Sequence, residues 1–187
     1  MKEQFNQYLD KYKYSNFEIS LASNYDDDIL EGIINFFDYD YNNNVEIKLD
    51  FASVKFFIFN DYDLENIVWL ADHISSDLVY VASAYREYCN DVGGLGSVAI
   101  IDEFNLIDKS QNFEEKVQII KFFLSKTIEK LQIIGIGALL FMSKALILDL
   151  EVSDRIFLIN ELLDFNIIPI YQDSTDVVLA RNLDYTI

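Results

Sequence analysis

The chain has few of the residues on which cross-linking and metal chemistry depend. Of its 187 residues, one is Cys, one is His and one is Pro. A single Cys excludes an internal disulfide framework and a cysteine-based zinc site, and a single His excludes a metal site built from several imidazoles. One Pro and six Gly leave too little material for a Pro-rich or Gly/Ser-rich linker. We therefore expect residues 1–187 to form a single domain without a metal site.

Basic residues are also scarce. The chain has 14 Lys and Arg against 32 Asp and Glu, which gives a formal net charge of −18. A charge of this sign repels phosphate backbones, so we expect no direct binding to DNA or RNA.

Long apolar runs are absent. The longest covers residues 133–142, whereas a membrane-spanning helix needs about 20 apolar residues. The first residues, MKEQFNQYLDKYKYSN, are polar and lack the apolar centre of a signal peptide. We expect no membrane association and a cytoplasmic location, with which the lone Cys agrees.

What the chain does contain is apolar and aromatic material. Hydrophobic residues make up 51% of it, with 15 Phe and 12 Tyr, which is enough for a well-filled core and excludes a disordered chain. The hydrophobic spacing predicts helices and strands in alternation. The expected helices are 3–12, about 26–41, 63–88 and 113–131, with another opening at Ser153 or Asp154. The expected strands are 17–22, 45–51 and 53–59 (as a hairpin), 97–107, 133–142, 166–171 and 176–181.

The second half of the chain carries a resemblance to a known superfamily. From residue 97 onward the expected order is strand, helix, buried strand, helix, strand, strand. The tail reads INELLDF over 159–165, then IIPI over 167–170, then VVLARNL over 177–183. In its element order over about residues 45–187, and in these motifs, the chain resembles the GNAT N-acetyltransferase superfamily. The resemblance implies an α/β (α+β) fold with a mixed central sheet flanked by helices. In that sheet, strands 97–107 and 133–142 would be adjacent, parallel and central, with helix 113–131 crossing between them.

The same resemblance implies acetyl-CoA as cofactor, with its pyrophosphate on the loop between the fourth strand and the next helix. The candidate cofactor-binding residues are Asp108, Lys109, Ser110, Gln111, Asn112 and Phe113. Members of the superfamily carry Gly here, because Gly lets backbone N–H groups approach the phosphates at a helix N-terminus. This loop has no Gly, and Glu114 and Glu115 follow it in the first helical turn. Asn112 and Glu115 instead form a capping-box pattern.

The residues expected to perform the chemistry are also replaced. The Tyr that can protonate the leaving thiolate in the superfamily falls at Asn160, and the Gly before the Phe falls at Asp164. We therefore expect an eroded acetyl-CoA site, no catalytic residue and no cofactor.

Two further segments look like phosphate-binding motifs. Residues 132–137 (QIIGIG) fit the acetyl-CoA pattern, but a helix precedes them and too few residues follow for the remaining elements. A buried strand with small residues is the simpler interpretation. Gly93–Gly96 precedes a strand rather than a helix, which favours a connector.

Other candidate residues have similarly plain interpretations. Asp38–Asn42 matches the first ligand positions of a calcium loop, but Asn43 and Leu49 replace its Gly and its bidentate Glu, so an acidic turn is favoured. Asp72 and His73 are neighbours in a helix, and their side chains point apart. Cys89 has no second His to activate it.

The acidic residues allow two interpretations. Carboxylates spread along the whole chain are most often a solubility feature, but they can also mimic a nucleic acid and occupy a basic groove on a partner. The candidate partner surface comprises Asp26, Asp27, Asp28, Asp38, Asp40, Asp61 and Asp63. In a mimic these residues would converge into one stripe with few Lys or Arg. If the acidic residues serve solubility alone, acidic and basic residues would be interspersed over the surface.

Three hypotheses for function follow. The first is a pseudoenzyme with an acetyltransferase-like fold that binds a basic protein as an inhibitor or regulator. The second is an active acetyl-CoA-dependent N-acetyltransferase with a diverged loop, acting on a cationic amine. The third is an unrelated α/β module in which the resemblance is accidental.

Overall fold

One mixed sheet organises the molecule. The computed structural model describes residues 12–23, 28–42, 45–61, 63–89, 97–107, 112–148 and 150–183. Seven strands form a sheet in the order β1-β2-β3-β4-β5-β7-β6, in which β4 and β5 are parallel and every other pair is antiparallel. The strands are β1 Asn16–Ala22, β2 Ile29–Asn42, β3 Val45–Phe59, β4 Val98–Leu106, β5 Ala138–Met142, β6 Ile168–Gln172 and β7 Val177–Asn182. This mixed α/β architecture confirms the expected fold class.

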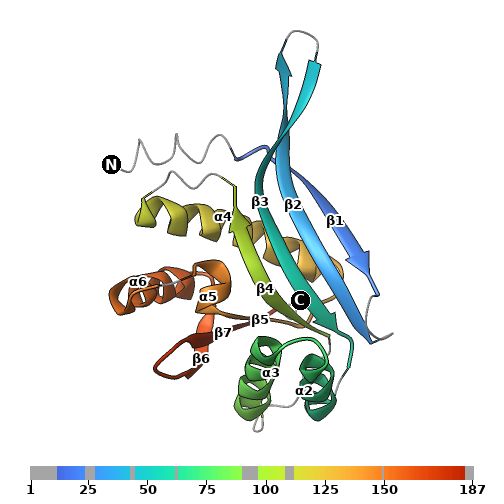
Figure 1. The fold of residues 1–187 in the computed structure, drawn as a ribbon, viewed down its shortest axis with the longest axis vertical. Coiled ribbons are helices and arrows are strands. Elements are labelled where there is room, and N and C mark those ends of the chain that lie inside the picture. The colour runs from blue at the N-terminus through green and yellow to red at the C-terminus, as the bar shows by residue number, and fades with distance from the viewer. Residues whose placement is uncertain are drawn as a thin grey trace.

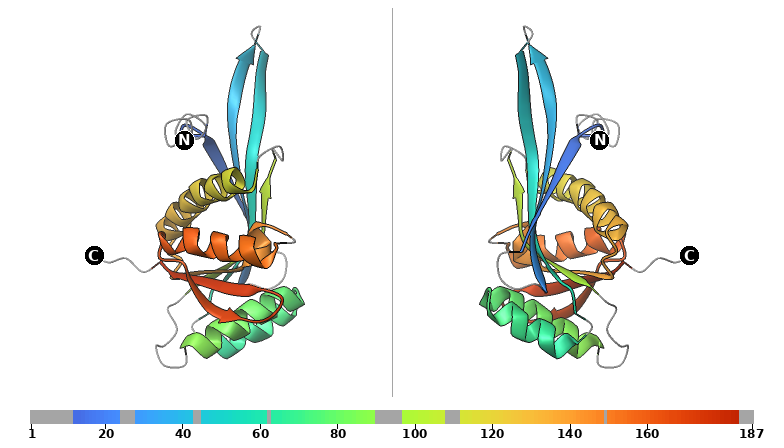
Figure 2. Two further views of the ribbon diagram at one scale, coloured as in Figure 1. Left: turned by 90° about the vertical axis from the view of Figure 1, so that its left-hand side faces the viewer. Right: turned by 90° about the vertical axis from the view of Figure 1, so that its right-hand side faces the viewer.

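Helices cover both faces of the sheet (Figures 1 and 2). The helices of the described residues are α2 Leu64–Asp72, α3 Ser76–Cys89, α4 Phe113–Ile133, α5 Ser143–Leu146 and α6 Val152–Leu163. Helices α4 and α6 pack on one face and α2 and α3 on the other, so two hydrophobic cores lie on opposite sides of the sheet.

The aromatic strand β3 shows how one sequence supplies both cores. Its side chains alternate between the faces, as a strand requires. Val54, Phe56 and Ile58 lie in the core under α4 and α6, whereas Phe57 and Phe59 lie in the core under α2 and α3. Such a run without polar residues is expected where both faces of a strand are covered.

The centre of the sheet agrees with the sequence-based prediction. Strands β4 and β5 are parallel neighbours, in register from Val98 opposite Ala138 to Ile101 opposite Phe141, and α4 lies between them in the chain. The predicted capping box at Asn112 is also present. The predicted buried strand 133–142 is shorter than expected, because Ile133 is still helical and β5 begins only at Ala138.

Two predictions for residues 26–59 are wrong. The segment expected as a helix from about residue 26 to 41 is strand β2, and the expected hairpin of 45–51 with 53–59 is the single strand β3. Four apolar residues in 29–37 have helical spacing, but the buried positions Gly32, Ile34 and Phe36 alternate. β-branched and aromatic residues favour a strand, and Gly32 disfavours a helix. The hairpin turn lies instead between Asn42 and Val45, which are paired.

The helix predicted over 63–88 is in fact two helices. Asp63 caps α2 by accepting a hydrogen bond from the Glu65 backbone N–H, as expected. A second start follows at Ser75, whose hydroxyl accepts a hydrogen bond of 3.2 Å from the Leu78 N–H. Residues 75–77 (Ser-Ser-Asp) therefore form a helix N-terminus, although the apolar spacing continues through them without a break. The expected helix 3–12 and connector 91–96 lie almost entirely outside the described residues.

In the part of the chain that the structure describes, no helix is long and apolar enough to cross a membrane.

Candidate functional site

The parallel strands β4 and β5 separate halfway along β4. Their last pair is Ile101 with Phe141, yet β4 continues beside β3 as far as Leu106. A register shift against β3 leaves Asp102 as the extra residue of β4, and such a bulge bends a strand. After β5 the chain turns directly into α5. The C-terminal half of β4 therefore faces α5 on this side instead of a neighbouring strand.

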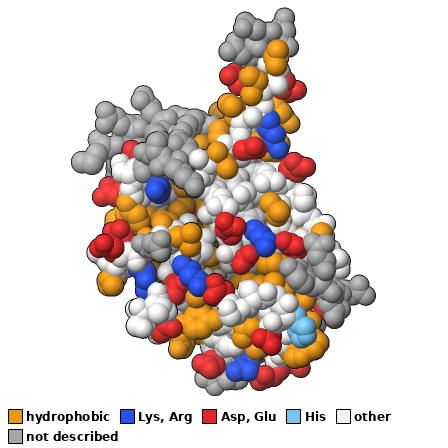
Figure 3. Space-filling view, viewed as in Figure 1, with side chains coloured by type: hydrophobic (Ala, Val, Ile, Leu, Met, Phe, Trp, Pro, Cys, Tyr) orange, Lys and Arg blue, Asp and Glu red, His pale blue; other side chains and the backbone are white. Residues whose placement is uncertain are grey.

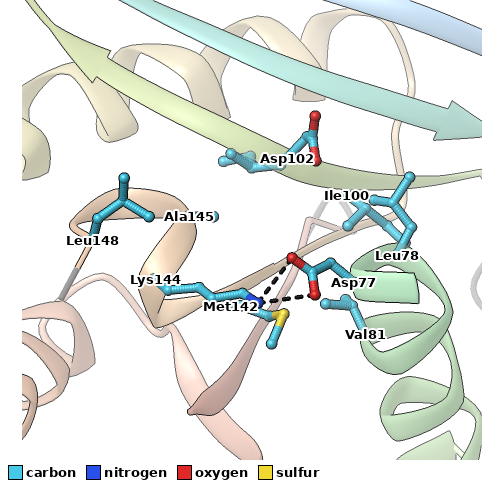
Figure 4. Close-up of a pocket in the computed structure, with 10 residues that line it drawn as sticks. Asp77, Leu78, Val81, Ile100, Asp102, Met142, Lys144, Ala145 and Leu148 are labelled. Carbon is cyan, nitrogen blue, oxygen red and sulfur yellow. Dashed lines mark hydrogen bonds and ion pairs between the residues drawn. The ribbon is translucent and has the colours of Figure 1, made fainter. Parts of the chain in front are cut away.

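A cavity of about 170 Å³ lies at this separation (Figure 4). Its apolar lining includes Leu78 and Val81 from α3, Ile100 from β4 and Met142 at the end of β5. Its charged residues are Asp77, Asp102 and Lys144. A neighbouring cavity of about 240 Å³ follows β4 along Asp102–Asn105 and shares the α5 side of the first one. Together they form a hollow beside β4, which we call the β4–α5 hollow.

The three charged residues of the first cavity, Asp77, Asp102 and Lys144, form ion pairs. The Lys144 Nζ lies 2.8 Å from a carboxylate oxygen of Asp77, and Figure 4 shows this pair on one side of the cavity with Asp102 on the other. The Lys55 Nζ lies 3.2 Å from Asp102 and 3.4 Å from Glu31. Burial alone lowers the pKa of Lys55, but hydrogen bonds and attraction from Asp102 and Glu31 outweigh it and raise that pKa. Lys55 therefore stays protonated and cannot act as a base.

The N-terminus of α4 is occupied by its own side chains. The Asn112 Oδ1 accepts a hydrogen bond of 3.0 Å from the Glu115 N–H, and the Glu115 carboxylate accepts one of 3.3 Å from the Asn112 N–H. The Phe113 ring packs against Phe157 at 5.8 Å. Of the other candidate cofactor residues, Asp108, Lys109, Ser110 and Gln111 lie outside the described residues. A phosphate group at this helix start would have to displace the Glu115 carboxylate from the amide it occupies.

The position that corresponds to the proton-donating Tyr of the superfamily holds Asn160, and the position of the Gly before the Phe holds Asp164. Asn160 is exposed on α6 and does not line the hollow. Asp164 ends α6 and lies 3.9 Å from Lys121, which also binds Glu161 at 2.6 Å. The hydrogen bond from Lys121 holds the pKa of Glu161 below its usual value. These groups join α6 to α4 and have a structural role.

The acetyl-CoA-like pattern at 132–137 is the C-terminus of α4. Gly135 has a φ of +85°, which is the left-handed conformation typical of the residue after a helix. The Gly135 N–H donates to the Gln132 carbonyl, and the Ile136 N–H donates to the Leu131 carbonyl, both at 3.1 Å. The interpretation as a buried strand is therefore wrong for these residues, and Gly135 ends the helix.

The remaining single-residue candidates also have structural explanations. Residues 38–42 lie in strand β2 and not in a calcium loop, and no cluster of metal-ligating residues occurs in the described ranges. The His73 Nδ1 lies 2.8 Å from the Trp69 carbonyl oxygen, and the two rings are in contact. Cys89 is buried, and burial raises the pKa of its thiol. The segment 93–96 lies outside the described residues.

The candidate acidic surface divides into two groups. Asp28, Asp61 and Asp63 lie at one end of β2, where the Asn60 N–H donates to the Asp28 carbonyl. Asp38 and Asp40 lie at the other end, ten residues further along the strand and so roughly 33 Å away. Asp26 and Asp27 lie outside the described residues. The two groups do not form one continuous stripe.

Basic residues are interspersed among the acids. Figure 3 shows Lys and Arg beside Asp and Glu over much of one face. Ion pairs of the described residues are Lys48 with Glu18 and Asp50, Lys55 with Glu31 and Asp102, Arg86 with Glu65, Lys121 with Glu161, Lys126 with Glu129, and Lys144 with Asp77. On this face the charge pattern is the one that the sequence analysis associated with solubility.

The sequence analysis did not single out the charged residues of the β4–α5 hollow. A usable signal exists for two of them, because Asp102 directly follows the part of β4 that pairs with β5, and Lys144 lies two residues after the end of β5. The carboxyl ends of parallel neighbours meet at one edge of a sheet, where ligands commonly bind. Asp77 lies in the first turn of α3, within the range that the sequence predicts as one continuous helix. Its place beside the hollow therefore does not follow from the sequence.

No family model matches the chain, and no curated protein matches it either.

Proposed function

We propose that the chain is a divergent GNAT-like protein with an eroded acetyl-CoA site, and that it acts by binding a basic protein as an inhibitor or regulator. The order of strands and helices around β4, α4 and β5 supports the fold assignment. The observation that carries the loss of acetyl transfer is the start of α4. Its Asn112 and Glu115 amides are bonded to side chains of the same turn, and one of those side chains is a carboxylate.

A carboxylate at this place opposes a phosphate in two ways. It accepts the hydrogen bond from a backbone amide that an anion would need, and its charge repels a second anion. Glu114 adds a further negative charge to the same turn. In the superfamily that the chain resembles, Gly residues leave these amides open.

The preference for a basic partner rests on charge. A net charge of −18 on 187 residues accelerates the encounter with a basic protein, and that attraction weakens as salt screens it. The partner's contacts need not cover the whole acidic surface.

Affinity capture followed by reconstitution tests this function. The full chain is immobilised and exposed to total protein of the source cells, and each retained protein is purified and titrated against it. We expect a retained protein with an excess of Lys and Arg that binds directly, with an affinity that falls steeply as salt rises. Binding that does not change with salt, or retention of acidic proteins only, contradicts the proposal.

The second candidate function is acetyl transfer to a cationic amine, and the β4–α5 hollow favours it. The hollow has an apolar lining and two carboxylates, Asp77 and Asp102, that attract an ammonium group. It runs along β4 towards the end of that strand, from which the chain leads to α4. Release of free CoA from acetyl-CoA in the presence of polyamines or Lys-rich peptides, measured with a thiol reagent, would establish this function in place of the first.

A further inference from the structure

Two strands extend beyond the rest of the sheet. β1 pairs with β2 only as far as Phe37, and β4 pairs with β3 only from Ala52 onward. Residues 38–42 and 45–50 therefore form a two-stranded extension, which we call the ribbon. Figures 1 and 2 show it projecting from the body of the molecule. Within the described residues, neither outer edge of the ribbon has a neighbouring strand.

The open edge of β2 arises because the chain turns away before β1. The Ser15 N–H donates to the Tyr12 carbonyl in a turn, and the buried Tyr12 ring packs against Phe51 and Phe123. This packing holds the turn before β1 against the core, so the chain does not continue along the ribbon. The backbone groups on that edge of residues 38–42 thus have no partner strand in the described part of the chain.

The two faces of the ribbon differ in chemistry. Residues directly opposite each other in an antiparallel pair lie on the same face. Asp38 is opposite Leu49 and Asp40 is opposite Ile47. This face carries carboxylates on β2 and an aliphatic row on β3, in which Val45, Ile47 and Leu49 are 58%, 46% and 43% exposed. We call it the acidic-aliphatic face.

The opposite face of the ribbon combines aromatic residues on β2 with charged residues on β3. Phe37 and Tyr39 on β2 lie opposite Asp50 and Lys48 on β3. The Lys48 Nζ lies over the Phe37 ring at 4.1 Å and 3.7 Å from Asp50. Asp38 and Asp40, in contrast, have no ion pair with a Lys or Arg of the described residues. The Asp38 carboxylate only accepts a local hydrogen bond from the Tyr39 N–H at 2.8 Å.

Resting on the proposed function, we infer that the outer edge of β2 in the ribbon binds an extended segment of the basic partner in which Lys or Arg alternates with apolar residues. A strand added at this edge would use the open backbone groups, as in β-strand addition. Its basic side chains would lie beside Asp38 and Asp40. Its apolar side chains would lie beside Phe37 and Tyr39 on the other face. Because one face of the ribbon is acidic and the other aromatic, the partner segment must alternate basic and apolar side chains.

Charge argues against a second copy of this chain as the occupant. Two β2 edges paired with each other would bring two sets of Asp38 and Asp40 together, and like charges on neighbouring strands are destabilising. Charged residues on an exposed edge are also how proteins prevent such self-pairing. A basic segment meets neither obstacle.

A titration with defined peptides tests the ribbon. The probe has alternating Lys and Val with blocked ends, and its matched control has alternating Lys and Ser. Binding to the full chain is followed by NMR at low salt, with the variant pair Asp38→Asn and Asp40→Asn compared with the pair Asp72→Asn and Glu87→Gln. Both pairs remove two charges, and Asp72 and Glu87 are exposed residues of α2 and α3 that lie on the body of the molecule, outside the ribbon, and do not line the hollow. The melting temperatures of both double variants are first shown to equal that of the wild type.

We expect the Lys-Val peptide to shift the resonances of Tyr39 and Ile47 and to bind more tightly than the Lys-Ser peptide. The ribbon pair should weaken binding roughly five- to tenfold, since each exposed ion pair contributes modestly, and the body pair less than about twofold. Equal weakening by both pairs, or shifts confined to the body, would overturn the ribbon inference while leaving a basic partner in place. Failure of both peptides, together with failure of the captured partner, would overturn the proposed function itself. Dimerisation of the chain through the ribbon would also contradict the inference.

Discussion

Gly32 in β2 shows how tightly a single residue is fitted into the core. A Cβ added at Gly32 would lie 2.3 Å from the Cζ of the Phe56 ring, a distance that no packing tolerates. Phe56 is fully buried between β3 and the helices above it. The ring can therefore move only by displacing its neighbours.

We predict that Gly32→Ala lowers the free energy of unfolding by about 1–3 kcal/mol, because overpacking forces side chains out of their preferred rotamers. Chemical denaturation measures the change. Ala52→Gly, at a buried position on the adjacent strand, is a control that removes a methyl group without adding volume. Unchanged stability of Gly32→Ala would show that Phe56 has room to move.

Asp173 is held ionised by a set of donors in the β6–β7 turn. Its carboxylate accepts hydrogen bonds from the Tyr80 hydroxyl at 2.6 Å, from the Thr175 hydroxyl at 2.7 Å and from the backbone N–H groups of Thr175 and Asp176. These bonds, led by the one from Tyr80, hold the pKa of Asp173 well below its usual value. The stabilisation is therefore present above the ordinary Asp pKa of about 3.9 and is lost as the pH falls below it.

We predict that Tyr80→Phe raises the pKa of Asp173 towards its usual value, as measured by NMR titration. The melting temperature of the variant should fall below that of the wild type at neutral pH, and the difference should shrink below about pH 4. A difference that is the same at both pH values would mean that the lost stability does not come from the hydrogen bond to the ionised Asp173 carboxylate, since the Phe ring of the variant keeps the contact with Tyr171.

At the scale of elements, the start of α4 bears on both the stability of the fold and the proposed function. The capping box satisfies two backbone N–H groups that a helix would otherwise leave open. We predict that Asn112→Ala lowers the free energy of unfolding by about 1 kcal/mol, the usual effect of losing a cap. Denaturant titration measures it, and Asn112→Asp, which keeps the cap, should be close to wild type. Equal loss in both variants would contradict the role of Asn112 as a cap.

The elements also show which parts of the fold the sequence can predict. The parallel pairing of β4 with β5 was implied by the resemblance to a known fold, and the cap at Asn112 followed from a local motif; both are confirmed. Strand β2 did not follow, because Ile29, Ile33, Ile34 and Phe37 satisfy helical spacing as well as strand propensity. Only pairing with β1 and β3, which is not local, decides between them.

The candidate site could be predicted only where it is local in sequence. The carboxylates and amide at the start of α4 are consecutive residues, so their capping box was visible. The β4–α5 hollow brings together Asp77, Asp102 and Lys144 from three elements, and its shape depends on a bulge in β4. The two-group arrangement of the acidic residues likewise depends on the length of β2, which the sequence analysis read as a helix.

At the scale of the whole molecule, the excess of negative charge opposes the compact state. With a net charge of −18, carboxylates repel one another more than the ion pairs compensate. We predict that raising the salt concentration from about 0.01 M to about 0.1 M, which shortens the Debye length from about 30 Å to about 10 Å, raises the melting temperature by a few degrees. Scanning calorimetry at constant pH checks this. A fall in melting temperature would mean that the ion pairs stabilise the fold more than the repulsion destabilises it.

The central proposal is that the chain is a divergent GNAT-like protein that has lost its acetyl-CoA site and acts by binding a partner. Calorimetric titration of the chain with acetyl-CoA tests it most directly, because the Glu115 carboxylate accepts a hydrogen bond from the Asn112 N–H at the expected phosphate site. We predict no saturable heat up to millimolar acetyl-CoA and no rise in melting temperature, although a ligand at about 1,000 times its Kd would add about 4 kcal/mol of stability. Saturable binding in the micromolar range would contradict the claim and establish the chain as an acetyl-CoA-binding protein.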